Sequence, residues 1–229
     1  MVLPADSHVH NEWSWDTGGP SSEAAGRMEC SCDRAAAISL SAVIFTEHLD
    51  FTTRCAQAQR TSRPHQRHLL GEDGYLRPPA LDVVGYLDCI DRCRHRFPEL
   101  RILTGVEFGQ PHLFAEHAAR SLDLTAMDRV NGSLHTLHIE DDRSEPNTLF
   151  RVWAPDDVVR AYLQEIPRMV AGSDSFTVFS HIDYAVRAWP VADIGSFDPR
   201  RFEEGFRTAM RAIADSGRAL EMNTRRLWP

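Results

Sequence analysis

Histidine and carboxylate side chains recur in this chain at one kind of place, the ends of apolar, β-branched runs. Such runs are typical of buried strands. The residues at these ends are, in chain order, His8 and His10, Glu47 and His48, Glu107, His135, and His181. The carboxyl ends of parallel strands lie together at one end of an α/β fold. We therefore expect these side chains to meet in one cavity.

The pair formed by His8 and His10 is the most informative of these signals. Side chains two residues apart on a strand point to the same face, as two imidazoles that bind one cation must. A single histidine without such context is more often a hydrogen-bonded core residue or a surface residue. The neighbouring Asp6 favours the interpretation as metal ligands, because carboxylates commonly orient metal-bound imidazoles.

Glu107 and His181 each end an apolar run. A carboxylate buried at such a place must be paired, protonated or bound to a metal, because burying it alone is costly. His135 follows the small residues Gly132 and Ser133, which let the backbone approach a ligand closely. These three positions therefore extend the cluster that His8 and His10 begin.

The five histidines, Glu107 and Asp16 together exceed what a single structural zinc site uses, and no cysteine takes part. Nitrogen and oxygen donors in this number suit two or three divalent ions such as Zn, Mn or Fe, with Glu107 as the natural bridge. Such a cluster suits hydrolysis. One ion lowers the pKa of a bound water, and the ions together neutralise charge on a phosphoryl group.

The elements that must position these residues alternate between strand and helix. Strands are expected at 42–46, 101–108, 129–134, 176–180 and 219–222, with a first strand that ends at His10. Helices are expected at 22–39, 82–97, 111–122, 155–169 and 199–216. This alternation predicts an α/β fold with a mostly parallel sheet or barrel. Residues 54–79, rich in Arg, Gln, His and Pro, are expected to form a long surface loop beside the site.

Composition narrows the class of protein. With 229 residues, 42% hydrophobic and 25% charged, the chain suits one folded domain spanning residues 1–229. The net charge of -8 disfavours a nonspecific nucleic-acid binder. No apolar run reaches the roughly 18 residues of a membrane span, and the N-terminus lacks the pattern of a secretory signal. Five cysteines, an odd count, favour the cytoplasm. The oligomeric state stays open.

The ordered motifs resemble the polymerase-and-histidinol-phosphatase (PHP) superfamily of metal-dependent phosphoesterases. The motifs are His8-x-His10, Asp16, Thr46-Glu47-His48, Gly105-Val106-Glu107, Gly132-Ser133-x-His135 and Ser180-His181. The stretches FTEHLDF, TGVEFGQP, NGSLHTLH, SHIDYAVR and LEMNT are most similar to its histidinol-phosphatase branch. The resemblance covers essentially the whole chain and implies a distorted (β/α)7 TIM-like barrel with a three-metal cluster.

The resemblance also implies how the metal ions are shared. His8 and His10 would hold the first ion with Glu107 bridging. Glu107, His135 and His181 would hold the second, and Asp16 and His48 the third. The family has a further Asp-x-His motif near the C-terminus, which this sequence lacks. We therefore expect a barrel that is incomplete at its C-terminus, an intact second metal site and a weak or empty third.

The resemblance implies a phosphoric monoester hydrolase, with L-histidinol phosphate as the leading substrate and histidine biosynthesis as the pathway. Arg187, six residues after His181, is the first candidate to bind the phosphate, since arginine pairs with two phosphate oxygens at once. Arg225 is the second, although both also fit solvated surface arginines. Two alternatives stay open: a phosphodiesterase or exonuclease of the same superfamily, and a non-catalytic metal-binding protein that binds an anionic ligand.

Overall fold

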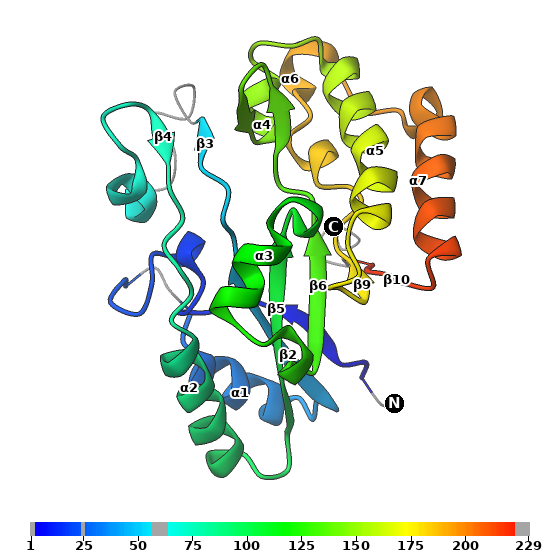
Figure 1. Cartoon of the computed structure of the whole chain (residues 1–229). Helices are drawn as coiled ribbons and strands as arrows, with labels where there is room; N and C mark the ends of the chain where they lie inside the picture. The colour runs from blue at the N-terminus through cyan, green and yellow to red at the C-terminus, as the bar shows by residue number, and fades with distance from the viewer. Residues whose placement is uncertain (1–2, 24–25, 56–63, 223–229) are drawn as a thin grey trace.

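Six parallel strands form the main sheet in the computed structural model, which describes residues 3–23, 26–55 and 64–222 (Figure 1). Their order across the sheet is β1-β2-β5-β6-β9-β10. The strands are β1 (Asp6–Val9), β2 (Ala42–Leu49), β5 (Arg101–Gly109), β6 (Arg129–Ser133), β9 (Val178–Phe179) and β10 (Ala219–Leu220). The prediction of an α/β fold with a parallel, TIM-like sheet is confirmed, and the described residues form half of such a barrel.

The register of the central strands brings the predicted site residues side by side. β2 extends to Leu49, beyond its predicted end, so Glu47 and His48 lie within the strand. His48 is directly opposite Glu107 on β5, and Gly109 at the end of β5 is opposite Ser133 on β6. The pairing of three adjacent strands therefore places His48 and Glu107 at one carboxyl edge.

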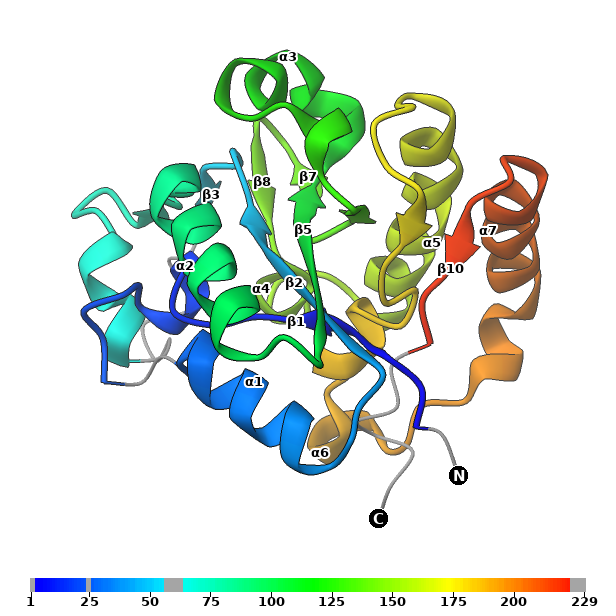
Figure 2. The same ribbon diagram turned by 90° about the horizontal axis from the view of Figure 1, so that it is seen from below.

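Helices follow the strands and cover the sheet. They are α1 (Met28–Ala37), α2 (Val83–Arg96), α3 (Pro111–Ser121), α4 (Pro146–Leu149), α5 (Pro155–Ala171), α6 (Val191–Ile194) and α7 (Glu203–Asp215). In Figure 2, α1 and α2 lie on one flank of the sheet and α5 and α7 on the other. Pro111 and Pro155 begin their helices as predicted, because the first turn needs no proline N–H. No helix in the described ranges is long and apolar enough to cross a membrane.

Two predicted helices differ from those observed. The helix expected at 22–39 begins only at Met28, whose backbone N–H donates to Glu12 Oε2 at 2.7 Å. A side chain 16 residues away in sequence therefore caps this helix. The helix expected at 199–216 starts as a 3-10 turn, Pro199–Phe202, before α7.

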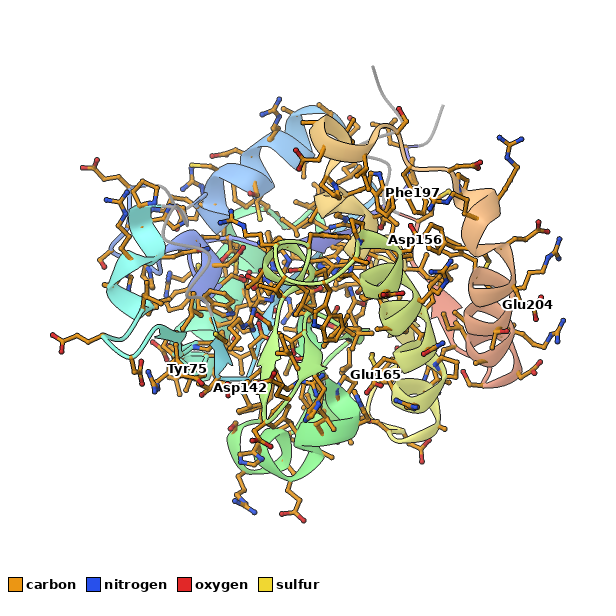
Figure 3. The ribbon with its side chains drawn as sticks, turned by 90° about the horizontal axis from the view of Figure 1, so that it is seen from above. Tyr75, Asp142, Asp156, Glu165, Phe197 and Glu204 are labelled. Atoms are coloured by element: carbon orange, nitrogen blue, oxygen red, sulfur yellow. The ribbon has the colours of Figure 1, made fainter. Side chains whose placement is uncertain are left out.

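The described part of the segment expected to be a long surface loop, residues 54–55 and 64–79, is partly buried. It contains the antiparallel strands β3 (Arg54–Cys55) and β4 (Tyr75–Leu76) and a 3-10 helix, Pro64–Leu69. The surface prediction is wrong for Arg54, which is only 2% exposed. The Tyr75 hydroxyl donates to Asp142 at 2.6 Å, which ties β4 to the hairpin of β7 (Leu137–Ile139) and β8 (Asp142–Ser144) (Figure 3).

Two apolar clusters hold the sheet to its helices. The larger joins β5, β6 and β9 to α5 and α7. The smaller joins β2 and β5 to α1 and α2. The buried Tyr86 hydroxyl of α2 lies 3.0 and 3.1 Å from the backbone oxygens of Phe45 and Gly105, which share its single proton. The strands that carry the site are therefore packed rigidly from both flanks.

Candidate metal centre

The Glu107 carboxylate lies at the centre of the predicted site. Its side chain is only 1% exposed, and its two oxygens face two different groups of histidines. Around Oε2 lie His8 Nε2 at 3.3 Å, His10 Nε2 at 3.1 Å and His48 Nδ1 at 3.3 Å. Around Oε1 lie His135 Nε2 at 3.1 Å and His181 Nε2 at 2.5 Å. One carboxylate is thus in contact with all five predicted histidines.

These contacts exceed what hydrogen bonding to Glu107 can satisfy. Ser133 Oγ also donates to Oε1, at 2.5 Å, so six polar groups surround two oxygens that have about four lone-pair sites. His8 Nε2 and His10 Nε2 face each other at 3.0 Å. Imidazole nitrogens that converge in this way, with a shared carboxylate, are a donor set that fits divalent cations.

Among the described residues, three overlapping groups of side chains have ligand atoms close enough to hold a metal ion. They are His8, Glu107 and His181; His10, His48 and Glu107; and His48, Asp50 and His135. Glu107 belongs to two of the three groups, as the proposed bridge between ions. The groups differ from those that the family resemblance implies, since His8 lies with His181 and His10 lies with His48.

Asp16 lies at the outer side of this cluster. It belongs to a 3-10 turn, Trp15–Thr17, and its Oδ1 is 3.7 Å from His48 Nε2. Its backbone oxygen accepts hydrogen bonds from Gln66 Nε2 at 2.7 Å and from His65 Nε2 at 2.8 Å. The structure therefore brings Asp16 close to His48, the residue with which the family resemblance pairs it.

The charges of the centre depend on one another. Burial alone would raise the pKa of Glu107, but the surrounding imidazoles lower it well below its usual range. Burial lowers the pKa of His8 and His135, but the Glu107 carboxylate raises it by more, so that both pKa values are about 10. Burial and the neighbouring His10 lower the pKa of His48 to about 4. Without metal, Glu107 is therefore an anion that draws protons onto two imidazoles.

Two carboxylates to which the sequence assigned no role also contact these histidines. Glu221, directly after β10, has its Oε2 2.8 Å from His8 Nδ1, on the side of the ring that faces away from Glu107. Asp50, directly after β2, has its Oδ1 3.3 Å from His135 Nδ1. Both residues stand at strand ends, so the same rule that selects the histidines would have found them.

A cavity of about 970 Å³ opens over the histidines. This volume suits a small-molecule ligand, since ligand pockets span roughly 300–1,000 Å³. Arg187 lines the cavity, and its Nη2 lies 3.2 Å from Asp183 Oδ1. Arg225, the second predicted phosphate ligand, lies outside the described residues.

A family model described as a PHP domain matches residues 6–225 of the chain. The structure is similar to that of histidinol phosphate phosphatase from Lactococcus lactis subsp. lactis Il1403, complexed with Zn, L-histidinol and phosphate. The TM-score is 0.72 at 22% identity, over 99% of this chain and 75% of that one. A putative histidinol phosphatase from Listeria monocytogenes gives a TM-score of 0.69 at 15% identity, over 98% and 84%. No curated protein matches the chain.

Proposed function

The chain belongs to the PHP domain family, and from this premise we propose that it is a metal-dependent phosphatase that hydrolyses a small phosphate monoester. The proposed substrate is L-histidinol phosphate, with L-histidinol and phosphate as products, in histidine biosynthesis in the cytoplasm. The observation that carries the proposal is the contact of five imidazoles with the single carboxylate of Glu107 beneath the cavity. The similar Lactococcus structure, which contains L-histidinol and phosphate, supports this choice of substrate.

We propose that two or three divalent ions, Zn, Mn or Fe, are the cofactors. When bound, such ions activate water as a nucleophile near neutral pH and neutralise charge on a phosphoryl group. Glu107 would bridge two of them, because its two oxygens face different histidines. The proposed ligands are His8, His10, Asp16, His48, Glu107, His135 and His181.

The cavity wall would orient the substrate. The Arg187 guanidinium can pair with phosphate oxygens, and Asp183 holds it at the cavity from 3.2 Å away. Arg225 remains a second candidate for the same task. Fixing the phosphate against the metal centre would place the phosphorus for attack, and such orientation contributes much of the rate enhancement in this class of reaction.

The test is phosphate release by the full chain, stripped with a chelator and reloaded with Zn, Mn or Fe. We expect metal-dependent release from L-histidinol phosphate, loss of that release in His10→Ala, and unchanged release in Glu204→Gln. Glu204 is an exposed residue of α7 that points away from the site (Figure 3). Release only from another small monoester would contradict the substrate. No release from any monoester by the metal-loaded chain would contradict the phosphatase.

A further inference from the structure

The Asp50 carboxylate is buried beside the metal centre and faces nitrogen atoms of four side chains. Trp15 Nε1 donates to its Oδ2 at 3.0 Å, and Arg54 Nη2 lies 3.2 Å from the same oxygen. Its other oxygen lies 3.3 Å from His135 Nδ1. Asp50 Oδ2 also lies 3.6 Å from His48 Nδ1. Asp50 itself does not line the cavity, although Trp15, Arg54, His48 and His135 do. Asp50 therefore touches the site only through its neighbours.

The contact with His135 sets which ring nitrogen can bind a metal. His135 Nε2 faces Glu107 at 3.1 Å, and Nδ1 faces Asp50. A carboxylate that accepts the Nδ1 proton leaves the Nε2 lone pair for a cation and fixes the plane of the ring. This arrangement assigns Asp50 the task of orienting His135.

Asp50 could also be read as a ligand, since His48, Asp50 and His135 are close enough to hold an ion. Arg54 opposes that reading. Its guanidinium is buried between Asp50 and Glu145, with Nη1 2.6 Å from Glu145 Oε1 and Cζ 5.0 Å from the centre of the Trp15 ring. A metal ion on Asp50 Oδ2 would meet this fixed positive charge at short range in a buried place, where repulsion is poorly screened.

Gly109 gives independent support. A Cβ at this position would overlap with Asp50 Oδ1 and would lie 3.3 Å from His135 Nδ1. Gly109 does not have a positive φ, so its backbone conformation is open to other residues. The absence of a side chain at the end of β5 is therefore explained by the space that the Asp50–His135 contact occupies.

We propose that Asp50 is a positioning residue that orients His135 for metal binding, and that Arg54 and Trp15 hold Asp50 in that task and outside the metal ligand shell. The inference rests on the metal centre of the proposed function. It goes further because it assigns tasks to a buried aspartate and a buried arginine that are not among the proposed metal ligands. It also explains why Arg54 is buried at the start of a segment whose composition suggests a surface loop.

The first test compares metal binding by the wild-type chain, Asp50→Asn and Gly109→Ala, with Zn²⁺ titrated against a chelating dye. We expect the same number of ions at saturation in all three, with one ion bound about 10- to 100-fold more weakly in both variants. Gly26→Ala is the matched control, because a Cβ there meets nothing within 4 Å. Loss of an ion at saturation in Asp50→Asn would show that Asp50 is a ligand, and unchanged affinity would show that it does not position His135.

The second test uses the visible spectrum of the Co²⁺-loaded chain, which reports the ligands of the ion. Arg54→Met frees the Asp50 carboxylate, so we expect a changed spectrum that reverts in the double variant Arg54→Met/Asp50→Asn. Arg54→Lys keeps the positive charge and should retain the wild-type spectrum. A spectrum unchanged in Arg54→Met, or one changed equally in the double variant, would overturn the task assigned to Arg54.

Neither test needs turnover. If the wild-type chain binds the ions but releases no phosphate, the proposed function is overturned, and the two metal-binding tests still decide the inference. If the wild-type chain releases phosphate and Asp50→Asn binds metal with unchanged affinity, only the inference is overturned.

Discussion

The metal centre has two parts, an inner flank formed by Asp50 and His135 and an outer flank formed by Glu221 and His8. In both, a carboxylate contacts a histidine, but the two pairs lie on different parts of the sheet. On the inner flank, Asp50 supports His135, and both are carried by the central part of the sheet around β2, β5 and β6. On the outer flank, Glu221 supports His8, and these residues belong to or adjoin the two strands at the ends of the sheet order, β1 and β10. In each case a carboxylate contacts Nδ1 while Nε2 faces Glu107.

What differs is how each carboxylate is held. Arg54 and Trp15 fix Asp50 on the inner flank. On the outer flank, β1 pairs with β2 and β10 pairs with β9, and in the described ranges the His8–Glu221 contact joins these two edges. His10, beside it, is also the most exposed of the five histidines, with 25% of its side chain accessible. The inner flank should therefore be preorganised, whereas the outer flank should depend on bound metal.

The largest effect is expected where the two flanks meet. Glu107→Gln removes the charge that both groups of histidines share, so both flanks should lose affinity for metal ions. Disrupting a buried charge network costs about 3–5 kcal/mol, so every ion should bind more than about 100-fold more weakly. Titration of Zn²⁺ measures this, with Glu204→Gln as control. Tight binding of even one ion in Glu107→Gln would show that the flanks hold metal independently.

The next effect separates the flanks. Substituting a residue that supports a metal ligand lowers the affinity for the ion by about 10- to 100-fold. We expect Asp50→Asn to lower the affinity for one ion by a factor near the upper end of this range, and Glu221→Gln by a factor near the lower end. Asp50→Asn should also lower the melting temperature of the metal-free chain, because it leaves the buried Arg54 with one ionised partner fewer. Glu221→Gln should leave that melting temperature nearly unchanged. Equal losses in both variants would remove the distinction.

The sequence predicts those features that depend on a pattern within one segment of the chain. His8, His10 and Glu107 end apolar runs, and the parallel fold gathers strand ends, so their convergence needed no knowledge of side-chain contacts. The tasks of Asp50 and Arg54 depend on a contact with His135, which is 85 residues from Asp50. The start of α1 likewise depends on Glu12, which lies outside the helix. Long-range contacts of this kind leave no periodic pattern in the chain.

Metal removal should act unequally on the two edges of the centre. Without ions, the His8–Glu221 contact is a single side-chain link between β1 and the residue after β10, so the amides of these strands should exchange hydrogen faster after chelation. The amides of β2 and β5, which pair along eight residues, should change little. Hydrogen exchange followed by mass spectrometry compares the two regions in one sample. Uniform loss of protection over both regions would mean that the metal stabilises the fold globally.

Both flanks should share a dependence on pH. Burial lowers the pKa of His8 and His135, but Glu107, together with Glu221 at His8 and Asp50 at His135, raises both to about 10, against an ordinary value of 6.5. In the metal-free chain, this raised pKa adds stability at and below pH 6.5, and that stability is lost as the pH rises through about 10.

Metal binding at neutral pH must displace the same protons, about two per chain. Calorimetric titration in buffers of different ionisation enthalpy counts them. In Asp50→Asn, His135 loses an anionic partner, so we expect the release of only about one proton on metal binding. An unchanged release of about two protons would show that Glu107 alone keeps His135 protonated.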